Sequence, residues 1–372
     1  MSDTDALISE SDALHARVRA FARGEASESE SFEVLAVELA RFQARYSPGF
    51  RRLVDARSAG LDRVASIPAV PSDTFRLARV AVHPPGLDAV RFVTSGTTSD
   101  ARGVHAMRVT DTYRELALRS GARALTEDGA ARRVVVALAP PPGESVTSSL
   151  GFMMRAFMED LDGRALTVDP AGACFDANAT GRWLASSSGV DVSGLRRAAL
   201  IANERQEPLL VLGTSLSLVL MLDALQGARI PAPRRTTIMN TGGFKGRRRE
   251  VSPAKLRRAV ARAFRVTEDR VIGEYGMTEL TSQLYEVEHG LYEPPAWLRV
   301  EPVDPVTLKP VPEGSEGLAR FIDLGNVDSA VAIVVQDLVR RRERGIELLG
   351  RRPGAPARGC SLAIEALVAG HG

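Results

Sequence analysis

Residues 209–225 read LLVLGTSLSLVLMLDAL, a short apolar run that leads directly into a longer apolar pattern. The first part, Leu209–Thr214, shows no polar alternation, which is typical of a strand buried on both faces of a parallel sheet. The second part, Ser215–Leu225, is long enough to predict a helix. A strand followed by a helix is the repeating unit of α/β folds, so this stretch predicts that class.

The same order of strand and helix recurs along the chain between residues 90 and 276. The predicted strands are VRFVTS (90–95), RRVVVALAP (132–140), TTIMNTGG (236–243) and RVIGEYG (270–276), and the predicted helices between them are Asp111–Leu125, Ser148–Leu161 and Ser252–Phe264. Apolar periodicity predicts two N-terminal helices, over Ile8–Ala22 and Phe32–Tyr46. After Pro294 the sequence becomes β-like and proline-rich, which predicts antiparallel strands in a smaller sheet.

Length and composition indicate a globular chain with more than one small core. Its 372 residues are predicted to form a core domain, residues 1–325, and a short C-terminal segment, residues 326–372. The contents of apolar residues, 44%, and charged residues, 25%, are those of ordinary globular proteins. A net charge of +2 gives no electrostatic footprint for nucleic acid, so no nucleic-acid partner is expected.

The cysteine count and the hydropathy pattern indicate the compartment. Only Cys174 and Cys360 are present, which excludes a disulfide framework and fits a reduced compartment. The acidic N-terminus has no apolar run of signal-peptide length. The run 209–225 is interrupted by Gly, Thr, Ser and Asp, so no membrane span is predicted. A soluble, cytoplasmic protein is expected.

Three glycine-containing motifs each follow a predicted strand. Residues 94–98, TSGTT, offer hydroxyls and backbone N–H groups that can wrap a polyphosphate. Residues 240–246, NTGGFKG, offer two glycines on which a ligand can lie flat and a lysine, Lys245, that can neutralise an anion. Residues 273–279, GEYGMTE, offer an aromatic face, a hydroxyl and a hard carboxylate that suits Mg²⁺. Each motif alone also fits an ordinary turn, but ligands of open α/β sheets bind at the carboxyl ends of strands.

Two of these motifs resemble signatures of a known superfamily. TSGTT resembles the phosphate-binding signature of the acyl-adenylate-forming superfamily, and YGMTE resembles its second signature. GGFKGR, GEYGMTELTSQ and GRRPGAPARGCSL are similar to the acyl-protein synthetase (LuxE-type) family within it, from about Phe92 to Leu367. The resemblance implies the large-domain fold of the superfamily, with layered α/β sheets and a smaller β subdomain. It also implies that ATP and Mg²⁺ activate a fatty acid, whose acyl group passes to a cysteine near the C-terminus and on to a reductase.

The resemblance also implies roles for particular residues of this chain. The β- and γ-phosphates would be held by Thr94, Ser95, Gly96, Thr97 and Thr98, the α-phosphate would contact Thr278, and Mg²⁺ would bind Glu279. The adenine would stack on Tyr275, with Gly242 and Gly243 beside the adenine and the acyl chain, and the ribose hydroxyls would bind Asp337. Arg351 would match the arginine that follows this acid in the superfamily, and Cys360 would accept the acyl group. Lys245 is a candidate to neutralise charge during adenylation. His105, which follows the TSGTT loop, either contacts the nucleotide or carboxylate or is a packed or exposed histidine.

Cys360 is also a candidate nucleophile by its sequence neighbours. Arg351, Arg352 and Arg358 would favour the thiolate that attacks an acyl-adenylate, and a helix beginning at Ser361 would add its partial positive charge. The alternative is a small apolar cysteine that fills space beside Leu362. Cys174 is expected to be structural.

Two departures from the superfamily pattern bear on function. Ser99 stands where a glycine usually follows TSGTT, which narrows the conformational freedom of that loop. About 35 residues follow Asp337, fewer than the roughly 100 residues of the mobile domain that such ligases carry. A truncated mobile domain favours acyl transfer to a built-in nucleophile, Cys360, over transfer to coenzyme A. The alternatives are a ligase that passes the acyl group to coenzyme A or a carrier protein, and a non-catalytic nucleotide-binding subunit.

Overall fold

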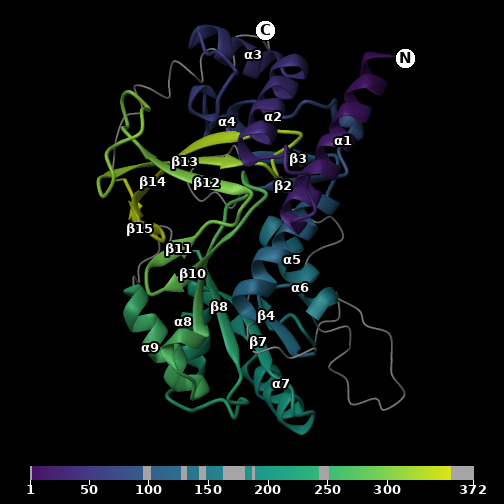
Figure 1. Ribbon diagram of the computed structural model, residues 1–372. Coiled ribbons are helices and arrows are strands. Elements are labelled where there is room, and N and C mark those ends of the chain that lie inside the picture. Colours follow the sequence, from purple (N-terminus) through teal and green to yellow (C-terminus); the bar gives the residue numbers. More distant parts are fainter. Residues whose placement is uncertain are drawn as a thin grey trace. The chain divides into compact units, whose positions relative to one another are not determined.

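The computed structural model describes residues 2–94, 102–126, 132–141, 148–161, 181–186, 189–242 and 251–352 (Figure 1). The chain divides into two compact units. The first unit comprises Met1–Ala117, Met277–Gln283 and Gly290–Gly372, and the second comprises Leu118–Gly276 and Leu284–His289. Both units combine helices with strands, and the predicted α/β class is confirmed.

The second unit is built on a parallel sheet in which the strand order is β4-β7-β8-β9-β10. The parallel strands are β4 (Val134–Leu138), β7 (Leu209–Thr214), β8 (Thr237–Thr241) and β9 (Val271–Tyr275), and β10 (Leu284–Glu288) runs antiparallel to β9. All five residues of β4 and the first five of β7 are buried. The sequence prediction of buried parallel strands is therefore confirmed for this sheet.

Helices of the second unit bury their apolar side chains against these strands. They are α6 (Ser149–Leu161), α7 (Val192–Glu204), α8 (Ser215–Leu225) and α9 (Pro253–Phe264), with a short 3₁₀ helix at Glu268–Arg270 and a small hairpin of β5 (Ala185–Ser186) and β6 (Gly189–Val190). Apolar side chains of α7, α8 and α9 share one core cluster with alternate residues of the strands, such as Val134, Val136 and Leu138 of β4. Helix α8 begins where the sequence predicts, because Thr214 and Ser217 form a capping box at the end of β7.

The first unit joins an N-terminal helical layer to an antiparallel sheet. The helices are α1 (Asp3–Arg23), α2 (Phe32–Tyr46), α3 (Pro48–Ala56) and α4 (Thr74–Leu77), with 3₁₀ turns at Val64–Ser66 and Pro85–Leu87. The sheet order is β12-β13-β14-β15-β11, formed by β12 (Leu298–Val303), β13 (Glu316–Asp323), β14 (Ala332–Arg342), β15 (Gly345–Arg351) and β11 (Leu291–Glu293), and β1 (Val70–Pro71) pairs in parallel with β14. The antiparallel strands predicted after Pro294 are confirmed, but the separate, smaller sheet is not, because these strands are part of one 11-stranded sheet. Helix α5 (Asp111–Leu125) contributes residues to both units.

One predicted strand lies in a different sheet from the one expected. The VRFV segment forms β2 (Val90–Val93). Within the described ranges its one partner strand is β3 (Val104–Met107), antiparallel and paired from Val90↔Met107 to Val93↔Val104. The prediction that this strand belongs to the parallel sheet is wrong. It pairs instead with β3, the next strand along the chain, in a separate two-stranded sheet. In the sequence, the TSGTT motif belongs to the connection between β2 and β3, and residues 95–101 of that connection lie outside the described residues.

The domain boundary predicted at residue 325 falls between two strands of one sheet. Strands β13 and β14 lie on either side of it and pair from Glu316↔Arg340 to Ile322↔Ala332. The segment after Arg352 lies outside the described residues, so the separate role of residues 326–372 stays a prediction.

Candidate functional site

The TSGTT motif starts from a hydrogen-bonded hairpin base formed by Thr94 and Gly103. The amide of Thr94 donates to the carbonyl of Gly103 at 2.9 Å, and the amide of Gly103 donates to Thr94 Oγ1 at 2.9 Å. A Cβ at Gly103 would lie 3.0 Å from Thr94 Cγ2 and 3.2 Å from a side-chain carbon of Arg76, so only glycine fits without displacement. Ser95, Gly96, Thr97 and Thr98 lie outside the described residues.

His105, on β3, connects this hairpin to the second motif. Its ring is buried, with Nδ1 2.8 Å from the carbonyl oxygen of Thr278 and Nε2 2.9 Å from Ser329 Oγ. It stands opposite Phe92 in the hairpin register and meets the ring of Phe75 edge to face. Of the two alternatives left by the sequence, the packed histidine is the one observed.

The neutral form of His105 is favoured in the folded protein. Burial lowers the pKa of His105 to about 4, against a smaller opposing effect of the hydrogen bond to Thr278. A carbonyl oxygen can only accept, so Nδ1 carries the proton, and Nε2 accepts from the hydroxyl of Ser329. This tautomer satisfies both ring nitrogens inside the protein.

The segment that follows β13 holds the second motif from its other side. Asn326 Nδ2 donates to the carbonyl oxygens of Glu279 and Ala330 at 3.0 and 2.9 Å, and Asn326 Oδ1 accepts from Thr281 Oγ1 at 2.6 Å. Asp323 Oδ2 accepts from the amides of Thr281 and Ser282 at 2.9 and 3.0 Å. The backbone of residues 279–282 is thus fixed by buried side chains of residues 323–326.

Asp323 is the most deeply enclosed acid of this segment. Its second oxygen, Oδ1, accepts from Ser282 Oγ at 2.6 Å and from the amide of Gly325 at 2.9 Å. Burial raises the pKa of Asp323 to about 6, and these hydrogen bonds, together with those from the amides of Thr281 and Ser282, act in the opposite direction. This enclosure gives Asp323 a structural role, which is to fix the backbone of Thr281 and Ser282.

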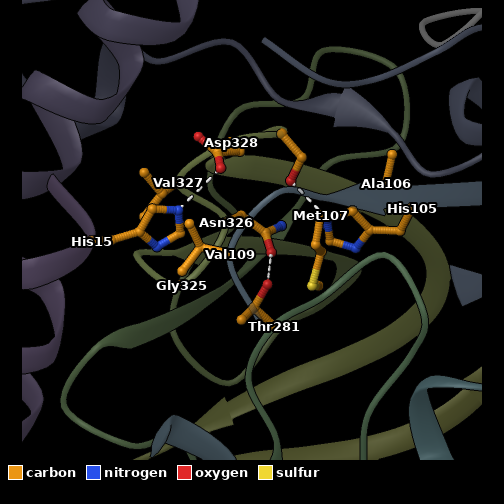
Figure 2. A pocket seen from close by; sticks show the side chains of 11 residues that line it. His15, His105, Ala106, Met107, Val109, Thr281, Gly325, Asn326, Val327 and Asp328 are labelled. Atoms are coloured by element: carbon orange, nitrogen blue, oxygen red, sulfur yellow. Dashed lines mark hydrogen bonds and ion pairs between the residues drawn. The ribbon is translucent and has the colours of Figure 1, made fainter. Parts of the chain in front are cut away.

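A small cavity of about 10 Å³ lies between this segment and His15, His105 and Met107 (Figure 2). Figure 2 shows His15 pointing toward Asp328, with Nε2 3.1 Å from Asp328 Oδ2, while His15 Nδ1 lies 2.8 Å from Thr112 Oγ1. A volume of this size holds about one water molecule and no substrate. The cavity therefore belongs to the support of the site and is not the substrate pocket.

Glu279 and Thr278 have the chemistry for a nucleotide with its metal ion. The Glu279 side chain is nearly buried, whereas Thr278 is partly exposed. Mg²⁺ usually takes one or two protein carboxylates and completes its shell with water and phosphate oxygens. The role of Glu279 as a magnesium ligand stays a prediction, and among the described residues no group of three or more potential metal ligands gathers.

In the second unit, predicted site residues lie at the carboxyl ends of β8 and β9. Gly242 follows β8, is exposed and has a φ of +70°, a conformation that favours glycine. Tyr275 is the last residue of β9 and is partly exposed. Ser215, at the start of α8, donates to the carbonyl of Gly242 at 2.6 Å. These contacts order the strand ends on which the proposed adenine and acyl sites depend.

Asp337 and Arg351 are brought together by the hairpin of β14 and β15. They are registered partners in this antiparallel pair. Asp337 is partly buried and Arg351 is exposed, so both can face a ligand. Gly243, Lys245 and Cys360, like Cys174, lie outside the described residues.

Sequence reasoning did not assign several residues that the structure adds to the neighbourhood of the predicted site. Glu274 lies inside the second motif, and Asn326 and Ser329 lie in the segment after β13. A run of Asp, Asn and Ser directly after an apolar strand, as in residues 323–329, is the signal that could have marked Asn326 and Ser329.

Among the described helices, none combines the length and the apolar character that a membrane-spanning helix needs.

Comparison with known proteins gives one curated relative and several related structures. No model of a known protein family matches the chain. The long-chain-fatty-acid–luciferin-component ligase of Vibrio harveyi is 26% identical over 150 residues, which are 38% of this chain and 39% of that protein. The match thus spans about two fifths of the relative.

Crystal structures of a 2-hydroxyisobutyryl-CoA ligase show the same fold. In its open conformation it matches 87% of this chain and 75% of its own, with 14% identity and a TM-score of 0.58. In its postadenylation state it matches 86% of this chain and 67% of its own, with 15% identity and a TM-score of 0.59. The resemblance predicted from the TSGTT and YGMTE motifs is confirmed, and the chain has the fold of the acyl-adenylate-forming ligases.

Proposed function

We propose that this protein is an ATP-dependent ligase that activates a carboxylic acid of the fatty-acid class as an acyl-adenylate. One observation carries the proposal. The buried side chain of His105 belongs to the hairpin whose base is formed by Thr94 and Gly103. Its Nδ1 lies 2.8 Å from the carbonyl oxygen of Thr278. One side chain thus connects the hairpin that carries the first motif to Thr278 of the second motif. This connection supports the proposal that both motifs bind the same nucleotide. The fold and the similarity to the Vibrio harveyi ligase support the same reading.

In the first half-reaction the carboxylate of the acid attacks the α-phosphorus of ATP, and pyrophosphate leaves. Thr94 and the Ser, Gly and Thr residues of 95–98 hold the β- and γ-phosphates, and Lys245 neutralises developing charge. Thr278 would bind the α-phosphate, and Glu279 would hold a Mg²⁺ ion, which would supply positive charge for the phosphates. Catalysis of this step is mainly positioning and charge neutralisation.

The resemblance to the acyl-adenylate-forming ligases supports a role in nucleoside binding for five residues. Tyr275 stacks on the adenine, beside Gly242 and Gly243. Asp337 accepts hydrogen bonds from the ribose hydroxyls, and Arg351, its registered partner on β15, adds positive charge. The partial exposure of Tyr275 and Asp337 supports these roles.

In the second half-reaction the thiolate of Cys360 attacks the acyl carbonyl carbon. The carbon–oxygen bond to AMP breaks, AMP leaves with the electron pair, and a thioester forms. The C-terminal segment, residues 326–372, then delivers the acyl group to a partner such as a reductase or a carrier protein. The alternatives are direct transfer from the adenylate to coenzyme A or a carrier protein, and nucleotide binding without turnover.

The test is ATP–pyrophosphate exchange across aliphatic and aromatic acids of graded length, followed by intact-mass measurement. Exchange with at least one acid supports adenylation, and absence of exchange with every acid supports the non-catalytic alternative. A mass increase equal to the acyl group, lost in Cys360→Ala but kept in Cys174→Ala, supports the thioester. If the wild type shows pyrophosphate exchange but no acylated protein is detected, direct transfer to coenzyme A or a carrier protein is favoured.

A further inference from the structure

His105 is a buried side chain that links two segments which the proposed reaction needs in register. It lies on β3, within the hairpin whose connection carries TSGTT, and its ring reaches the Thr278 carbonyl from Nδ1 and Ser329 from Nε2. The ring is 2% exposed and is packed against Phe75, so it touches no ligand directly. Its contacts are therefore to the supports of the site.

His105 contacts the Thr278 carbonyl from the hairpin side, whereas Asn326 holds the next carbonyl, that of Glu279, from the opposite side. Asn326 holds the carbonyl of Glu279 and the hydroxyl of Thr281. Ser329 belongs to the same segment as Asn326 and orients the His105 ring. The Thr278–Glu279 backbone thus sits between a hairpin contact and a contact from residues 326–329.

We propose that His105 is a positioning residue for the bound nucleotide, because its Nδ1–H sets Thr278 and Glu279 at a defined place relative to the TSGTT hairpin. The inference rests on the proposed function and names a residue that acts on it without contacting substrate. Removal of the Nδ1–H donor lets the Thr278 carbonyl shift, and the α-phosphate and metal contacts weaken. The affinity for Mg·ATP changes, and the affinity for the acid does not.

Two amide variants separate the nitrogens of the ring. The amide nitrogen of Asn lies where Nδ1 lies, and that of Gln reaches about as far as Nε2. His105→Asn keeps the donor to Thr278, and the KM for ATP in pyrophosphate exchange stays within about threefold of wild type. His105→Gln and His105→Leu lose that donor, and the KM for ATP rises roughly tenfold, with the KM for the acid unchanged.

Arg320→Met is the matched control for loss of a buried polar side chain. Arg320 donates to the carbonyls of Val64 and Ile67 at 3.1 and 2.7 Å and pairs with Glu301 at 2.7 Å, within the same unit. Its loss lowers the amount of folded enzyme, and so the apparent kcat, but leaves the KM for ATP unchanged.

The wild-type exchange assay separates the two levels of the argument. If the wild type exchanges with no acid, the proposed function fails and this inference falls with it. If the wild type exchanges but His105→Gln keeps the wild-type KM for ATP, or if His105→Asn is as impaired as His105→Leu, the positioning role of His105 alone is overturned.

Discussion

The hydroxyl of Thr241, at the end of β8, donates a hydrogen bond to the carboxyl of Glu274 on the neighbouring strand β9. The two residues are registered partners in the parallel pair, and both are buried. Burial raises the pKa of Glu274 to about 7, and the hydrogen bond from Thr241 acts in the opposite direction. An acid within the second motif is thus about half protonated at neutral pH, because its burial at the end of β9 excludes water.

This pair predicts a pH-dependent stability. The pKa of Glu274 is raised in the folded state, from 4.5 to about 7, so its favourable contribution is complete below pH 4.5 and is lost as the pH rises through 7. Glu274→Gln removes the titration and stabilises the protein by about 3 kcal/mol above pH 8, with little effect at pH 4.5. Urea denaturation of both proteins across this range checks it, and an equal difference at all pH values would contradict it.

A second prediction concerns Asp323, whose two oxygens both accept hydrogen bonds. An Asn has only one oxygen, so its NH₂ group must replace one of the two acceptors. That group would face other donors, either the amides of Thr281 and Ser282 or the Ser282 hydroxyl and the Gly325 amide. Asp323→Asn therefore lowers the free energy of unfolding by about 2–4 kcal/mol in urea denaturation.

Asp304 supplies the control for that substitution. Its hydrogen bonds, from Val306 and Thr307, all go to one oxygen, Oδ1, which an Asn also offers. Asp304→Asn is expected to leave stability nearly unchanged. An equal decrease in the free energy of unfolding in both variants would show that the hydrogen bonds to both oxygens of Asp323 are unimportant.

A third prediction concerns close packing of α5 against α6 in the second unit. A Cβ at Gly121 would overlap the ring of Phe157 and lie 3.1 Å from the hydroxyl of Tyr285. Gly121→Ala lowers the melting temperature, with a cost of about 1–3 kcal/mol, although alanine favours helices. Gly151→Ala on α6, where the nearest atom would be 3.5 Å away, is the control and raises stability by up to about 1 kcal/mol. Stabilisation by both changes would refute the packing argument.

A fourth prediction concerns the ribose contact proposed for Asp337. Asp337→Asn raises the KM for ATP roughly tenfold, because a charge-assisted hydrogen bond to a hydroxyl is lost. The variant also loses the preference of the wild type for ATP over 2′,3′-dideoxy-ATP in pyrophosphate exchange. Glu347→Gln, on the neighbouring strand and paired with Arg340 and Arg342, is the control and keeps that preference. A wild type without any ribose preference would exclude the role.

Much of the fold could be predicted from local pattern. Leu209–Thr214 and Ser215–Leu225 form the strand and the helix that their apolar sequence predicts, because burial on both faces leaves a continuous apolar run. The hairpin of β2 and β3 could not be assigned to its sheet, since strand composition does not state which partner a strand takes.

The candidate site divides in the same way. The roles proposed for Thr94, Thr278, Glu279 and Asp337 stay predictions, which rest on residue type and on the resemblance of the motifs to a known superfamily. The support of the site depends on residues far apart along the chain, such as His105 and Ser329, whose side chains meet 2.9 Å apart. By itself the sequence determined which groups are available and which runs must be buried. Only the tertiary structure decided which buried donor meets which acceptor, because that choice is made by the packing of distant segments and leaves no periodic trace in the chain.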